Sequence, residues 1–126
     1  MTAEELAAVL RLMGPARHAV IGTATDPTSR ADGARIAAVW DGDVLATVTW
    51  PETAASWLRQ ARRFATPDPD VWVVCATPAG WAAMTHRLRQ STTWSPHRTI
   101  VTSALADVRL PGIRDTRPDG TTWENR

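Results

Sequence analysis

The stretch VIGTATDPTSRADGARIAAVW, residues 20–40, reads as a buried strand, a polar loop and an amphipathic helix. The strand is expected over residues 19–24 and the helix over residues 28–40, with inward-facing positions at Ile36, Val39 and Trp40. Loops at this position of α/β proteins often hold a small ligand. The loop's Thr, Ser and Asp residues therefore either bind a ligand or only start the helix.

Strands and helices alternate through the rest of the chain. Further strands are expected at residues 44–49, 71–76 and 99–104, and further helices at residues 2–13, 52–65 and 79–90. This alternation predicts right-handed βαβ units and a parallel sheet. The fold class is therefore α/β: a small three-layer, doubly wound domain, flavodoxin-like, with about four strands in the order 2-1-3-4 and an extra N-terminal helix.

The pattern fades near the C-terminus. Residues 1–106 are expected to form a single α/β domain, and residues 107–126 an extended or partly disordered tail with a short last strand at residues 108–110. A chain of 126 residues fits one domain.

Composition narrows the function classes. The net charge is +1, which predicts no strong attraction to nucleic acid or to a membrane surface. All 14 basic residues are Arg, as in proteins from GC-rich genomes, so a phosphate-loop lysine and a Schiff-base lysine are excluded. The single cysteine, Cys75, lies in an apolar run and is expected in the core.

The N-terminus carries acidic residues where an export signal needs basic ones, and no apolar run is long enough to span a membrane. A cytoplasmic location is therefore expected, without a membrane partner.

Two loops are candidates for a ligand site. In strand order 2-1-3-4, the loops after the first and third strands meet where the order reverses, and both lead into a helix N-terminus that favours an anion. Hydroxyls, backbone N–H groups and an indole ring supply the contacts. The candidate ligand-binding residues are Thr23, Thr25, Asp26, Thr28, Ser29, Thr77, Gly80 and Trp81, and Trp50 is a second ring on which a ligand can stack.

The same loops have a purely structural interpretation. Asp26-Pro27 and Thr77-Pro78 place a capping side chain and a proline where any helix start favours them. Asp26 also repels a phosphate. Capping and ligand binding remain open alternatives at this point.

Other chemistry has weaker support. The three histidines, His18, His86 and His97, lack metal-ligand spacing, so no metal and no cofactor are predicted. No catalytic residues are assigned, although Asp26, Ser29, Ser103 and Asp107 are the candidates for acid, base or nucleophile if the protein is an enzyme.

A third alternative is an adaptor for nucleic acid or protein. Its basic residues fall on two helices and in the tail, with one aromatic residue among them: Arg59, Arg62, Arg63, Arg87, Arg89, Arg109, Arg114, Arg117, Trp123 and Arg126. Acidic residues in the tail offset much of this charge, so nucleic acid is not the favoured partner.

The layout of residues 19–106 resembles one lobe of the type I periplasmic-binding-like proteins, the solute-binding components of ABC transporters. The resemblance lies in a strand and helix at residues 20–40, in DGDVLATVTWPE at 41–52 and in DPDVWVVCATPAGWAAMTHRL at 68–88. It implies the lobe's fold and a ligand-facing edge at residues 25–29 and 77–81. Those proteins have two lobes, so a single lobe closes on a solute only as a dimer.

The favoured function is accordingly a non-enzymatic module that binds a small anionic or amphiphilic ligand, or a protein. A small enzyme acting at the same edge, and the adaptor, are the alternatives. A homodimer is an open possibility for its assembly.

Overall fold

The computed structural model describes residues 1–108 and 110–117. Within them the elements follow in the order α1 Ala3–Met13, β1 His18–Ala24, α2 Pro27–Val39, β2 Asp43–Trp50, α3 Leu58–Ala65, β3 Val71–Cys75, α4 Pro78–Ser91, the 3-10 turn η1 Pro96–Arg98, β4 Thr99–Val101, the 3-10 turn η2 Ser103–Leu105 and β5 Arg114–Asp115.

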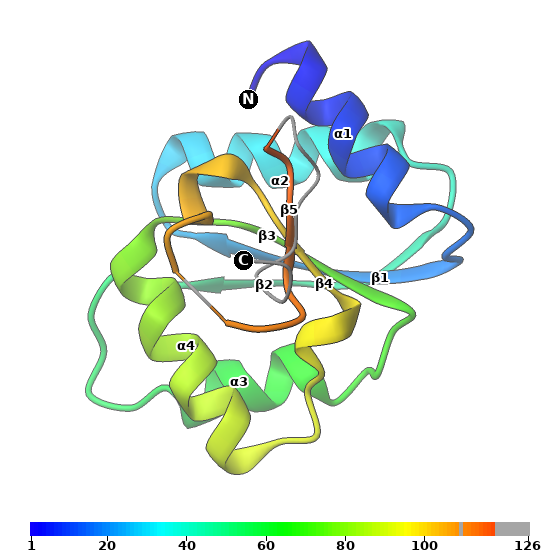
Figure 1. Ribbon diagram of the computed structural model, residues 1–126. Helices are drawn as coiled ribbons and strands as arrows, with labels where there is room; N and C mark the ends of the chain where they lie inside the picture. Colours follow the sequence, from blue (N-terminus) through cyan, green and yellow to red (C-terminus); the bar gives the residue numbers. More distant parts are fainter. Residues whose placement is uncertain (109, 118–126) are drawn as a thin grey trace.

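The strands form one parallel sheet in the order β2-β1-β3-β4-β5. Helices α1 and α2 lie on one face of this sheet, and α3 and α4 lie on the other (Figure 1). The α/β fold class, the three layers and the predicted order 2-1-3-4 are confirmed, and a fifth strand extends the sheet beyond β4.

Local sequence explains where α1 begins and ends. The Thr2 hydroxyl accepts a hydrogen bond from the Glu5 backbone N–H at 3.0 Å, as expected of an N-cap residue. Gly14 stops the helix with φ +54°, a conformation that costs a glycine little.

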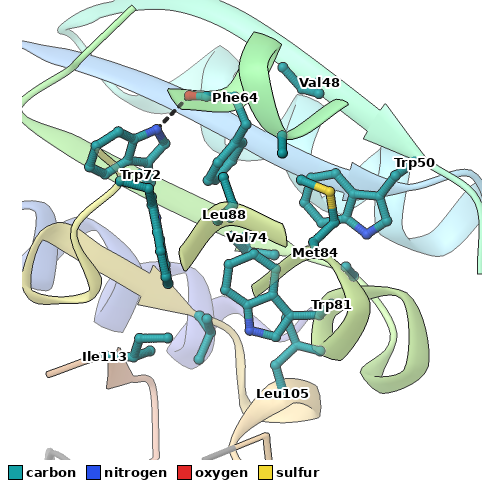
Figure 2. Packing of buried hydrophobic residues seen from close by; sticks show 14 of the residues in the cluster. Val48, Trp50, Phe64, Trp72, Val74, Trp81, Met84, Leu88, Leu105 and Ile113 are labelled. Carbon is teal, nitrogen blue, oxygen red and sulfur yellow. Dashed lines mark hydrogen bonds between the residues drawn. The ribbon is translucent and has the colours of Figure 1, made fainter. Parts of the chain in front are cut away.

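The layer between the sheet and α3/α4 is aromatic. Trp50, Phe64, Trp72, Trp81 and Trp94 are all buried and form what we call the aromatic cluster (Figure 2, where Trp50, Phe64, Trp72 and Trp81 are labelled). Trp50 and Trp81 stack with ring centroids 5.9 Å apart, and Trp81 meets Trp94 edge to face, also at 5.9 Å. The cluster fills the space under the two helices.

Helix α3 begins at Leu58, whereas the sequence predicts a helix from Glu52. Residues 51–57 instead form an irregular connection that follows the sheet edge. Glu52 is held there because its carboxylate binds the backbone of α4, and the Ser56 hydroxyl accepts a hydrogen bond from Leu58 N–H at 3.3 Å. These contacts compete with the helical hydrogen bonds that residues 52–57 would otherwise make.

The prediction of which residues of α2 face the core is partly wrong. Ile36 is buried as expected, but Val39 is 52% exposed and Trp40 only half-buried. Helix α2 packs closely on β1 at Gly33, which approaches Ile21 and Thr23.

The C-terminal segment also differs from the prediction. A short strand at Arg114–Asp115 pairs with β4. Val108 and Leu110 of the predicted strand at residues 108–110 lie outside any strand, and Arg109 lies outside the described residues. Ile113 is fully buried in the aromatic cluster's layer, so residues 110–116 belong to the folded domain rather than to a tail. Residues 118–126 of the predicted tail lie outside the described residues.

Candidate ligand-binding site

Three neighbouring strands end together at one edge of the sheet. Ala24 of β1 is in register with Trp50 of β2, and Thr23 of β1 with Cys75 of β3. The segments that leave these strands, residues 25–26, 51–57 and 76–77, therefore lie side by side at the carboxyl edge. This is the edge at which open parallel sheets bind ligands.

The N-terminus of α2 is capped by its own sequence. The Asp26 carboxylate accepts hydrogen bonds from the Ser29 backbone N–H at 3.0 Å and from the Ser29 hydroxyl at 2.7 Å. These bonds, the one from the hydroxyl first, lower the pKa of Asp26 below its ordinary value. The carboxylate is thus charged and occupies the position that an anionic ligand would need.

The N-terminus of α4 is built differently. The N-cap residue, Thr77, makes no side-chain cap, and its hydroxyl oxygen is buried without a hydrogen-bond partner within the described part of the chain. Glu52 supplies a carboxylate from the neighbouring connection instead. Its Oε2 accepts a hydrogen bond from Gly80 N–H at 3.3 Å, a long distance for such a bond.

The eight predicted site residues fall into two groups. Thr25, Asp26, Thr28, Thr77 and Gly80 lie on the segments that meet at the carboxyl edge, with Thr25 and Thr28 exposed. The others face elsewhere or are already bonded: Thr23, Ser29 and Trp81.

Thr23 is buried under α2, where its hydroxyl bonds that of Thr49 at 3.1 Å. Ser29 is held by Asp26. The rings of Trp81 and Trp50 are fully buried in the aromatic cluster, so neither offers a face for ligand stacking, contrary to the expectation.

Sequence reasoning missed Glu52, because it counted this residue as part of a helix. The signal was its position: it follows Trp50-Pro51, directly after a strand that is expected to end at the same edge. A carboxylate placed there reaches the start of α4.

The residues named for the alternative functions are dispersed. Asp26 and Ser29 bind each other, while His18 begins β1 at the opposite edge of the sheet. Ser103 N–H donates to Glu5 Oε2 at 3.0 Å, and Asp107 is exposed. Among the described residues, no group of three or more His, Cys, Asp or Glu side chains is placed to hold a metal ion.

The basic residues expected of an adaptor are divided. Arg59, Arg62, Arg63 and Arg89 are exposed on α3 and α4, on one side of the sheet. Arg114 of β5 and the nearby Arg117 lie instead beside α1, and Arg117 pairs with the buried Asp115 at 2.8 Å. Arg109, Trp123 and Arg126 are outside the described residues.

A hollow in the described part of the chain lies away from the carboxyl ends of β1 and β3. It measures about 740 Å³ between α1 and residues 115–117. Glu5 lines it and accepts hydrogen bonds from Ser103 and from the Thr116 hydroxyl. Burial raises the pKa of Glu5, but these hydrogen bonds outweigh it and the net pKa is lowered.

The fold is that of one lobe of a periplasmic-binding-like protein. A substrate-binding periplasmic protein from Ralstonia solanacearum superposes on 82% of this chain with a TM-score of 0.66 and 12% sequence identity. An ABC transporter substrate-binding protein from Sphaerobacter thermophilus superposes on 85% of it, with a TM-score of 0.57 and 16% identity.

The chain spans about a third of the length of these proteins, 31% and 33% respectively. The resemblance seen in the sequence is thereby confirmed for the fold. No protein-family model and no curated protein sequence matches the chain. In the described part of the chain, no helix is both long and apolar enough to cross a membrane.

Proposed function

We propose that this chain is a small-molecule-binding module whose site lies at the carboxyl edge of β2, β1 and β3. The observation that carries the proposal is the buried hydroxyl of Thr77, which has no partner within the described residues at the start of α4. A buried polar group without a partner is costly and rare in folded proteins. A ligand that accepts a hydrogen bond from this hydroxyl would remove that cost.

The chemistry of the edge indicates the class of ligand. An acceptor group, such as a carboxylate or a phosphate oxygen, can bind both the Thr77 hydroxyl and the Gly80 N–H when Glu52 withdraws. The exposed Thr25 and Thr28 hydroxyls add neutral donors and acceptors. Asp26 remains as a negative charge, which favours a ligand that also carries an amine or hydroxyl group.

The similarity to substrate-binding proteins supports this assignment, since both of the similar solved structures are substrate-binding proteins. A non-enzymatic role and a cytoplasmic location, both expected from the sequence, are part of the proposal.

Native mass spectrometry of the protein purified without denaturation tests for a bound small molecule. The same chain is then compared by thermal unfolding in acetate, glutamate and inorganic phosphate. Midpoints that rise with one of these probes in the unaltered chain, but not in Thr77→Val, support the site. The matched control is Thr93→Val, an exposed loop position that should keep the full response. Absence of any bound mass and of any response to the probes would reject the proposal.

A further inference from the structure

Strand β2 lies at the edge of the sheet formed by the described residues. Among these residues it is hydrogen-bonded only to β1, on one side, and it is eight residues long. A strand at the edge of a sheet presents unpaired N–H and C=O groups that can pair with another chain. Lys and Pro, two common means of protecting an edge, are absent from Asp43–Trp50.

Two large apolar side chains in β2 and in the helix that precedes it are exposed. Val39 at the end of α2 and Leu45 in β2 are 52% and 46% exposed, and they are the large hydrophobic residues that stand out as exposed in the described part of the chain. Leu45 is the extra residue of a bulge, because Ala19 pairs with Val44 and Val20 with Ala46. Bulges often protect edges, but this bulge presents a leucine rather than a charge.

Neither layer of helices covers β2 fully. On the α2 face, a hollow of about 560 Å³ separates Thr47 and Thr49 from the small residues Ala34 and Ala38. On the α3 face, a hollow of about 370 Å³ lies between Ala46 and Val48 of β2 and the flank of α3. Small residues in both places leave room for side chains from a partner.

Basic and acidic side chains lie beside different parts of β2. Arg30 lines the hollow beside Thr49, and Arg62 and Arg63 line the hollow beside Ala46 and Val48. The basic side chains therefore flank β2 from its middle to its carboxyl end. Asp41 and Asp43 are exposed at its amino end. The Asp43 carboxylate lies 4.0 Å from Nε2 of His18, at the start of β1.

We propose that this edge is the interface of a homodimer in which β2 pairs antiparallel with β2 of a second copy. Antiparallel pairing about a two-fold axis places the acidic end of each strand beside the basic half of the other, and symmetry makes the contact twice. Both partners then contribute Leu45 and Val39. The charge pattern of β2 is complementary to the same pattern running in the opposite direction, and a second copy of the chain presents that pattern.

Sedimentation velocity of the full chain at low salt, over a wide range of concentrations, measures the assembly. The unaltered chain is expected to form a dimer that weakens as salt screens the charges. A chain that remains monomeric at every concentration overturns the proposal, whatever the outcome of the ligand tests.

Charge reversal tests the arrangement itself. The variant Asp41→Arg/Asp43→Arg and the variant Arg30→Glu/Arg62→Glu should each be monomeric, since each places like charges together twice. A one-to-one mixture of the two variants should dimerise, because every contact in the mixed dimer joins opposite charges. Circular dichroism shows that each variant is folded.

A matched control separates specific pairing from general attraction. The variant Arg87→Glu/Arg89→Glu changes the net charge by the same amount as Arg30→Glu/Arg62→Glu, but its substitutions lie on α4, away from β2. It should dimerise alone, and it should not form a mixed dimer with Asp41→Arg/Asp43→Arg. A dimer that survives both charge reversals, or a mixture that stays monomeric, overturns the antiparallel β2 interface.

Discussion

The carboxylate of Glu52 accepts a hydrogen bond from the backbone N–H of Gly80, a residue 28 positions further along the chain. The contact fastens the connection after β2 to the start of α4. It also places the protein's own carboxylate where a ligand's acceptor group is proposed to bind. Glu52 is therefore both a cap for α4 and a competitor for the site.

Replacing Glu52 separates these two effects. Glu52→Gln keeps an acceptor oxygen but removes the charge that the helix N-terminus favours, so the free energy of unfolding should fall by about 0.5 kcal/mol. Binding of acetate or phosphate should strengthen, because the competing carboxylate is gone. Chemical denaturation and calorimetric titration measure the two quantities. Weaker binding in this variant would show that Glu52 assists the ligand rather than competing with it.

Gly22 is required by the aromatic cluster. A Cβ at this position would lie 2.4 Å from the Trp50 ring and 2.8 Å from the Phe64 ring. Gly22→Ala should therefore lower the free energy of unfolding by about 1–3 kcal/mol through overpacking. In a Trp50→Phe background the smaller ring leaves space, and the cost should shrink. Equal costs in both backgrounds would contradict the contact.

Asp26 should make stability depend on acid pH. Its pKa is below the ordinary value of 3.8 in the folded protein, so the folded state binds this proton less readily than the unfolded chain does. Its contribution to stability is complete above the ordinary value and is lost as the pH falls through the lowered pKa.

Asp26→Ala removes the cap and should cost about 1 kcal/mol at neutral pH. Urea denaturation at a series of pH values should show the difference from the unaltered chain shrinking toward acid pH. A difference that persists undiminished at acid pH would assign the effect to packing instead of charge. Asp32→Ala is the comparison variant on the same helix, and its effect should follow its ion pair with the N-terminus, 3.2 Å away.

Cys75 should resist modification in the native protein. Burial, aided by the nearby negative charges of Asp32 and Glu5, raises the pKa of this thiol to about 12. The thiolate is the reactive form, so labelling with a disulfide reagent at pH near 8 should proceed only as the protein opens. Complete labelling in urea is the positive control. Rapid labelling of the native chain would contradict the buried position in β3.

The sequence alone predicts the features that depend on hydrophobic periodicity and on helix-capping residues. Strand β3 is apolar throughout and was correctly predicted as part of a sheet between two helical layers. Helix α1 begins after Thr2 and ends before Gly14, as these residue types predict. The strand order followed from the rules of right-handed crossovers.

The features it did not predict depend on contacts between distant residues. Glu52 leaves the helical pattern because of Gly80, and β5 pairs with β4 over only two residues, too short to show a period. Trp81 was expected at the ligand site, and its packing against Trp50 and Trp94 places it in the core instead.

The aromatic cluster also gives the protein an optical signal. The chain has no tyrosine, so its near-ultraviolet absorption is dominated by its seven tryptophans. The ring planes of Trp50 and Trp81 stack at 22° within the buried aromatic cluster, and Trp50 lies against Gly80 at the start of α4. A ligand that displaces Glu52 from Gly80 would bind next to the residue against which Trp50 packs. Near-ultraviolet circular dichroism and intrinsic emission can thus follow occupancy of the edge without any attached label.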